Sequence, residues 1–258
     1  MKLGRNLLPP AVGTAIAIAI TSVMDAVGLS VFSARPLFPL AWLFCFWEGF
    51  DRRAIGLVWG GGRHYRWAVL YPLTALLTAA LIAFASGATD VTQTNWRNFW
   101  VNLLLGGSTT VVVSLLTEEG FFRGWLWASL TRAGISRAGT LVASSAAFSL
   151  WHVSAVILKT GFELPAMRVP VYLLNVLLIG LIWGMLRQAS GSVVVASVSH
   201  GLWNGFAYAL FAFGTKVGAL GVEQTAVFGP EVGVVGLLLN GLFAGLLWRW
   251  LRGRDSAF

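Results

Sequence analysis

The chain has 258 residues, of which 57% are hydrophobic and 11% are charged, and its formal net charge is +8. Its mean hydropathy is +0.76, whereas soluble domains carry about 25% charged residues. This composition excludes a water-soluble globular domain and predicts an integral membrane protein. The basic residues lie at the ends of apolar runs, as in a membrane topology signal, so the positive charge does not indicate nucleic-acid binding.

Eight apolar runs follow one another along the chain, and a helix needs about 20 such residues to cross a bilayer. The short second run is counted as a crossing because the basic segments that flank the first two runs are both expected in the cytoplasm. With that count, 13 of the 18 Lys and Arg lie inside. The sequence therefore predicts an all-α, polytopic membrane bundle of about eight transmembrane helices with both termini cytoplasmic. The runs lie at about 10–32, 37–50, 67–86, 99–130, 138–158, 170–186, 192–213 and 230–251.

The whole chain, 1–258, is interpreted as one integral membrane domain, because the loops are too short for a second domain and no internal repeat is visible. The first run follows Lys2 and Arg5 and is long, so we expect a retained span and not a cleavable signal peptide. The polar residues that suggest chemistry fall in a motif-bearing core at about 99–213.

Inside the fourth run, the segment Leu115–Trp125 reads L-L-T-E-E-G-F-F-R-G-W and places three charged residues in apolar surroundings. Charged residues are rare in membrane spans and are functional-site candidates there. On a helix that continues to about Leu130, Glu119 and Arg123 share a face and can pair. Glu118 points about 100° away from Glu119. We therefore predict a structural Glu119–Arg123 pair and a reactive Glu118.

Two further polar sets lie within apolar runs. The fifth run contains F-S-L-W-H at 148–152, and the seventh contains S-H-G-L-W-N-G at 199–205. In the second of these, His200 and Asn204 are four residues apart and share a helix face. With a helical rise of about 1.5 Å per residue, the three polar sets come to similar depths in the membrane. The sequence thus predicts that they meet.

Three other features are expected to be structural. His64 falls in a basic segment and is expected to be a solvated loop residue. Asp25 lies inside the first run and should face the bundle interior or the outer interface. Gly241 and Gly245 form a G-x-x-x-G pattern in the eighth run, which is typical of close helix packing.

A carboxylate, two imidazoles and a carboxamide together can hydrolyse a peptide bond. The carboxylate can act as general base on water, while a histidine and the amide can donate hydrogen bonds to an oxyanion. Two histidines and a carboxylate are also a ligand set for zinc or iron, and a bound metal would take Glu118, His152 and His200. The spacing H-E-x-x-H is absent, and from the residues alone the metal-bound and metal-free alternatives stay open.

Three further roles for these polar residues stay open. A serine nucleophile is less favoured, because serines in membrane helices mostly bond their own backbone or pack. The polar sets could be interhelical contacts that hold the bundle together. A transporter with a proton-relaying carboxylate has little support, because no two-fold repeat is visible. The serines near the motifs are Ser149, Ser197 and Ser199.

The segment T-E-E-G-F-F-R-G at 117–124 resembles the E-E-x-x-x-R motif of the CAAX-protease and bacteriocin-processing (CPBP) family of intramembrane proteases. The segment at 148–152 is similar to the family's F-x-x-x-H motif, and H-G-L-W-N at 200–204 is similar to its H-x-x-x-N motif. Order, spacing and predicted spans agree, and the resemblance covers about 113–208. It implies eight transmembrane helices and a relation to the ras-converting endopeptidase, which removes the tripeptide after a prenylated cysteine.

The resemblance also implies roles for individual residues. Glu118 would activate the water together with His152. His200 and Asn204 would form the oxyanion hole. The supporting residues would be Glu119 and Arg123. The family has been labelled metalloprotease, but its archaeal member resembles a glutamate-dependent hydrolase, which favours no cofactor over zinc.

The function implied is an intramembrane endopeptidase for membrane-associated proteins or peptides, with prenylated CAAX-type substrates among the candidates. The alternative is a non-catalytic scaffold or bacteriocin-immunity protein of the same family. Expected partners are membrane lipids and a protein or peptide substrate in the membrane, without nucleic acid, and the oligomeric state is not indicated. The expected location is the plasma (inner) membrane of a prokaryote.

Overall fold

The computed structural model describes residues 6–92, 94–211 and 217–255, and these residues form helices and no strands. The helices are α1 (Leu8–Ala26), α2 (Leu37–Glu48), α3 (Gly62–Ala85), α4 (Trp96–Val101), α5 (Gly107–Leu116), α6 (Trp127–Arg132), α7 (Arg137–Trp151), α8 (Val153–Ile157), α9 (Val169–Ser190), α10 (Val193–Leu210), α11 (Thr225–Phe228) and α12 (Val234–Asp255). A short 3-10 turn (Ser30–Phe32) and two π-helical turns (Asn102–Gly106 and Gly120–Leu126) complete the regular structure.

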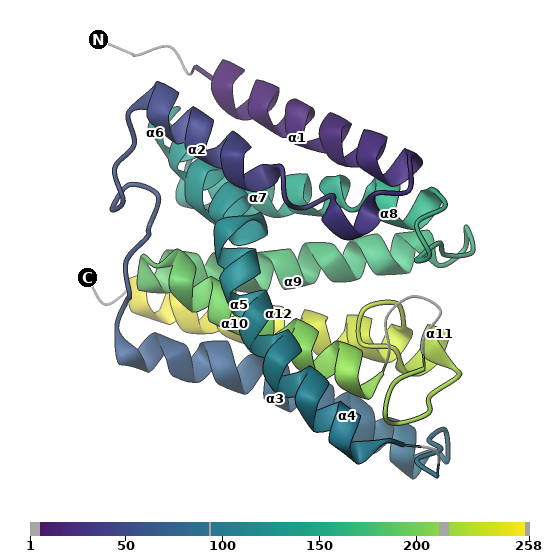
Figure 1. The fold of residues 1–258 in the computed structure, drawn as a ribbon. Helices are drawn as coiled ribbons and strands as arrows, with labels where there is room; N and C mark the ends of the chain where they lie inside the picture. The colour runs from purple at the N-terminus through teal and green to yellow at the C-terminus, as the bar shows by residue number, and fades with distance from the viewer. Residues whose placement is uncertain (1–5, 93, 212–216, 256–258) are drawn as a thin grey trace.

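The helices form a bundle in which the chain runs back and forth (Figure 1). The long segment from α4 through α5 to α6 crosses the others obliquely, so its two ends reach opposite sides of the bundle. The start of α1 and the end of α12 lie on the same side (Figure 1). The all-α polytopic bundle predicted from composition is therefore confirmed, and the cytoplasmic placement of the termini stays a prediction.

Seven described helices are long and apolar enough to cross a bilayer. The helix α10 is not among them, because serine, histidine, asparagine and glycine dilute its apolar residues. It nevertheless packs against α3, α5 and α9, so it lies within the bundle as an eighth long helix. The seven segments are Leu8–Ala26, Ser30–Glu48, Gly62–Ala85, Trp96–Arg132, Arg137–Ile157, Val169–Ser190 and Val234–Arg252.

The fourth run forms one helical segment of 37 residues, Trp96–Arg132, which confirms that the helix continues past Leu130. It is not regular throughout, because π-helical turns widen it at two places. The second of these turns begins at Gly120, where an added Cβ would lie 2.6 Å from the carbonyl oxygen of Leu115. Turns of this kind insert one residue into a helix and are frequent at functional sites. Here the turn follows directly after the two adjacent glutamates.

Large apolar side chains cover much of the outer surface. A bundle that contacts lipid can leave such side chains exposed, whereas a soluble monomer rarely exposes large apolar patches. The outward apolar side chains therefore agree with a multi-pass integral membrane protein. They include Val31, Trp42, Phe46, Leu81, Leu104 and Leu238, each more than 60% exposed.

Helices α5 and α10 approach each other closely. An added Cβ at Gly201 would lie 2.6 Å from the backbone nitrogen of Val111, and one at Gly205 would lie 2.8 Å from the Cα of Gly107. Small residues four apart allow helices in membranes to approach closely. The pattern predicted to do this in the eighth run is not close-packed: a Cβ at Gly245 would meet nothing within 4 Å.

Two polar residues outside the motifs have well-defined places. The expectation that His64 is a solvated loop residue is wrong, because α3 begins at Gly62 and His64 is a helical residue with 7% exposure. Asp25 faces the bundle interior, with 2% exposure, which is one of the two placements expected for it.

Candidate active site

The predicted pair of Glu119 and Arg123 is present and fully buried, with Arg123 Nη1 donating to Glu119 Oε1 at 3.1 Å. Arg123 Nη2 also donates to the carbonyl oxygen of Gly180 at 3.0 Å. The guanidinium carbon lies 4.3 Å from the centroid of the Phe148 ring. Planar guanidinium groups suit such combined ion-pair and stacking sites. Through Phe148 and Gly180, Arg123 therefore connects the long helix to α7 and α9.

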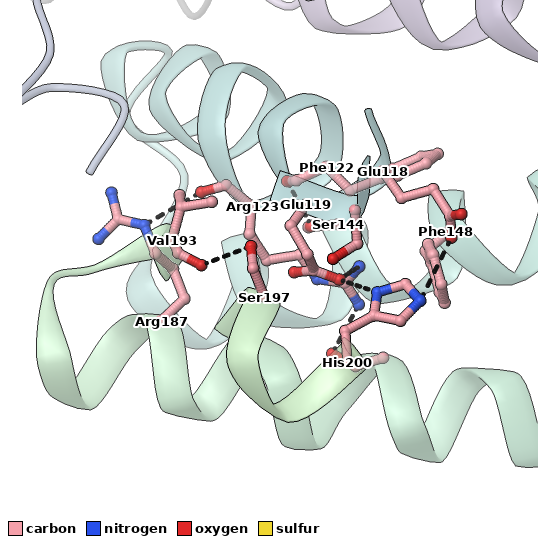
Figure 2. A network of polar contacts seen from close by, with 12 residues as sticks. Glu118, Glu119, Phe122, Arg123, Ser144, Phe148, Arg187, Val193, Ser197 and His200 are labelled. Atoms are coloured by element: carbon pink, nitrogen blue, oxygen red, sulfur yellow. Dashed lines mark hydrogen bonds and ion pairs between the residues drawn. The ribbon is translucent and has the colours of Figure 1, made fainter. Parts of the chain in front are cut away.

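Glu119 has a second partner that sequence reasoning missed. His200 Nδ1 lies 3.0 Å from the same Oε1 atom that accepts from Arg123, as the close-up in Figure 2 shows. The Glu119 oxygen that accepts from the guanidinium also accepts here, so His200 donates from Nδ1. Glu119 thereby fixes the orientation of the imidazole. The spacing of Glu119 and Arg123 on one helix gave no signal for this contact with α10.

Glu118 points away from the pair, into a cavity of about 70 Å³ lined by residues of several helices. Its carboxylate Oε2 lies 3.8 Å from His200 Nε2 (Figure 2). A single water needs roughly 10–15 Å³ of this kind of space, so the cavity can hold several. We call it the Glu118 cavity; its lining residues are Glu118, Phe148, His152, Tyr172, Val176, Ile179, Trp183, His200, Asn204, Tyr208 and Glu231. The structure thus brings together all four residues predicted to be catalytic.

His152 follows directly after α7, and its ring Nδ1 lies 2.9 Å from the carbonyl oxygen of Phe148. A carbonyl only accepts, so Nδ1 carries the proton of the neutral ring. The other nitrogen, Nε2, is then free of a proton and can accept a hydrogen bond. This leaves His152 suited to orient a water molecule or to take a proton from it.

His200 lies between two carboxylates and against an aromatic ring. Its ring is stacked on Trp183, with centroids 3.9 Å apart and planes 14° from parallel. Because Nδ1 donates to Glu119, Nε2 donates as well only when the ring carries both protons. Both ring nitrogens face carboxylates, Nδ1 that of Glu119 and Nε2 that of Glu118.

A third carboxylate, Glu231, also lines the Glu118 cavity and was not anticipated from the sequence. Its Oε1 accepts from Trp203 Nε1 at 2.8 Å. Its backbone carbonyl accepts from Asn175 at 2.9 Å, and Asn240 bonds Asn175 in turn at 2.9 Å. The only signal in the sequence is an acidic residue at the start of the last apolar run, which by itself indicates an interface and not a cavity.

A wider cleft of about 570 Å³ adjoins the Glu118 cavity on the side of Asn204. Asn204 and Tyr208 line both spaces. The cleft carries several side-chain amides and hydroxyls, which can pair with the amide groups of a peptide. We call it the amide cleft; its polar lining side chains include Thr94, Asn95, Asn98, Asn102, Thr110 and Asn204.

The metal alternative finds no matching arrangement here. Among the described residues, no group of three or more His, Cys, Asp or Glu side chains is placed to hold a metal ion. His200 Nδ1 is taken by Glu119, and His152 Nδ1 is taken by a carbonyl. Each ring keeps its Nε2 atom as the only nitrogen that could bind a metal, so the metal-free alternative stays a prediction, and we derive no step through a metal.

Fold and site together define a polytopic helical membrane protein with a polar, carboxylate-bearing cavity inside its bundle. Residues 100–206 match the family of type II CAAX prenyl endopeptidase Rce1-like proteins, which confirms the resemblance read from the three motifs. The matched segment runs from the long helix into α10 and contains Glu118, His152, His200 and Asn204. No curated protein matches the chain. The family match supports a CAAX-type intramembrane endopeptidase activity in general.

Proposed function

We propose that the protein is an intramembrane endopeptidase in which Glu118 activates water for attack on a peptide bond. The observation that carries this proposal is that Glu118, His152, His200 and Asn204 line one cavity with room for water. A carboxylate beside a confined water is a suitable general base. A second carboxylate, Glu119, is already committed to Arg123 and His200, so Glu118 is the residue available for chemistry.

The reaction step follows from these positions. Water, held by Glu118 and by His152 Nε2, adds its oxygen to the carbonyl carbon, and Glu118 takes the proton that is released. The carbonyl oxygen becomes an oxyanion, which accepts hydrogen bonds from His200 Nε2 and the Asn204 amide. The proton then passes to the amide nitrogen as the carbon–nitrogen bond breaks. The products are a carboxylic acid and an amine.

The substrate class we propose is a membrane-associated protein or peptide, with prenylated CAAX-type chains among the candidates. An extended segment would lie in the amide cleft, where side-chain amides can pair with its backbone. The proposed location is the plasma (inner) membrane of a prokaryote, where the lipid-facing surface and basic helix ends would fit.

The test compares cleavage of a membrane-peptide mixture by the wild-type protein and by Glu118→Gln and His152→Ala variants. Both variants should fold and lose at least about 100-fold in kcat, the usual size of a general-base contribution. Glu223→Gln, at an exposed position, is the matched control and should cleave normally. Undiminished cleavage by folded Glu118→Gln protein would contradict the proposal. If the protein is instead a non-catalytic scaffold, cells that carry the Glu118→Gln variant should keep the wild-type phenotype.

A further inference from the structure

Asp25, near the end of α1, is a buried carboxylate that the proposed reaction does not use. It is 2% exposed, and its Oδ2 accepts from the Ser154 hydroxyl at 2.6 Å. Its Oδ1 has no hydrogen-bond partner among the described residues. A buried polar atom without a partner is costly, and a buried charge without one is costlier still. Asp25 Oδ1 is therefore left unsatisfied by the described part of the protein.

Asp25 lines a cavity of about 230 Å³ that adjoins the Glu118 cavity. The two spaces share Glu118, His152, Tyr172 and Tyr208, so a group in one lies next to a substrate bond in the other. We call the larger space the Asp25 cavity. It lies beside Glu118 and His152, whereas the amide cleft adjoins Asn204.

Several other polar groups around the Asp25 cavity are already paired within the protein. Trp151 Nε1 donates to Thr21 Oγ1 at 2.7 Å, and Thr21 donates to the carbonyl of Ser33 at 3.2 Å. Ser30 donates to the carbonyl of Thr160 at 3.3 Å. Of the buried side-chain polar atoms on the described lining residues, Asp25 Oδ1 is the one left without a partner.

The charge and shape of this cavity favour a cation. Its described lining includes two carboxylates and no Lys or Arg. Arg35, which follows the lining residue Ala34, places its guanidinium 4.2 Å from the centroid of Phe32 instead. Aromatic rings also line the space, and their faces attract ammonium and guanidinium groups. These rings belong to Trp151, Phe162, Tyr172 and Tyr208.

We propose that the Asp25 cavity is a specificity pocket for a basic side chain of the peptide substrate, adjacent to the bond that is cleaved. Asp25 Oδ1 accepts from the guanidinium or ammonium group, while Ser154 holds the carboxylate in place. This proposal rests on the proposed endopeptidase function, because it names the substrate class of that site. The volume of about 230 Å³ suits one side chain and not a folded partner.

Binding tests the pocket without requiring cleavage. The probes are N-acetyl-arginine amide and its uncharged isostere N-acetyl-citrulline amide, added to the Glu118→Gln protein in detergent while thermal unfolding is followed. We expect the arginine probe to bind at least about 10-fold more tightly, because the pocket supplies an unpaired carboxylate. Adding Asp25→Asn should bring the ratio of the two probes' dissociation constants close to one. The Asn oxygen still accepts from Ser154 but carries no charge.

Two control variants separate charge from structure. Ser154→Ala removes the hydrogen bond that positions Asp25 but keeps the carboxylate, so it should lower the arginine preference and still retain part of it. Asp51→Asn removes a carboxylate at an exposed position, where it accepts from the backbone of Ala54, and should retain the full preference. The proposal that this pocket selects a basic side chain is overturned if the two probes bind equally. It is also overturned if the arginine preference survives Asp25→Asn.

Cleavage supplies the second readout. In a peptide mixture analysed by mass spectrometry, the wild-type protein should enrich Arg or Lys at one position next to the cut, and Asp25→Asn should abolish that enrichment. An arginine preference in binding with no cleavage of any peptide would refute the endopeptidase function and leave the pocket standing. Cleavage without a basic preference would refute the pocket and leave the endopeptidase function standing.

Discussion

Glu119 accepts hydrogen bonds from both Arg123 and His200 through one carboxylate oxygen, at 3.1 and 3.0 Å. This shared atom joins the long helix to α10, and it fixes which nitrogen of His200 faces Glu118. Glu119 is therefore a positioning residue as well as half of an ion pair. Glu119 is fully buried, so water cannot replace either the contact with Arg123 or the contact with His200 when its charge is removed.

Replacing Glu119 with Gln should destabilise the protein by about 3–5 kcal/mol, because it leaves the buried guanidinium of Arg123 without its counter-charge. The free energy of unfolding can be measured in bicelles by denaturant titration. Glu223→Gln, at an exposed position, should change it by less than about 0.5 kcal/mol. A Glu119→Gln protein as stable as the wild type would show that the pair does not hold the helix.

Replacing Gly201 with Ala should separate α10 from α5, because the new Cβ would lie 2.6 Å from the backbone nitrogen of Val111. Overpacking of this kind costs typically about 1–3 kcal/mol, and a shift of His200 should lower kcat as well. Thermal unfolding and peptide cleavage measure the two effects. Gly245→Ala is the matched control and should be neutral, since nothing lies within 4 Å of its Cβ position.

Removing metal ions should leave cleavage unchanged, because the described His, Asp, Glu and Cys side chains offer no three-ligand arrangement. Dialysis against a strong chelator, followed by metal analysis and a cleavage assay, checks this. Activity that disappears with the chelator and returns with zinc would show that Glu118, His152 and His200 rearrange to bind it.

Glu231→Gln should reduce kcat by less than about 10-fold, in contrast to Glu118→Gln. Gln keeps an oxygen that can accept from Trp203, so the start of α12 should hold its place. The comparison identifies which carboxylate of the Glu118 cavity activates the water. Equal losses in the two variants would assign part of the proton transfer to Glu231.

Several features of this protein follow from its sequence because they depend on local patterns. Apolar runs of bilayer length predict the helices, and two residues four apart on a helix can pair wherever that helix packs. The Glu119–Arg123 contact and the continuation of the long helix past Leu130 were predictable for this reason. The three motifs also predicted the family whose model matches residues 100–206, because each is a short local pattern.

Other features were decided only by the tertiary structure, because they depend on how distant helices pack. The π-helical turn at Gly120–Leu126 and the close approach of Gly201 to α5 are two such features. Glu231 enters the cavity from a segment 113 residues after Glu118, and no local pattern indicates that meeting. Packing also decides the hydrogen bond between Glu119 and His200 and the missing partner of Asp25 Oδ1. Both depend on helices that are far apart in the sequence.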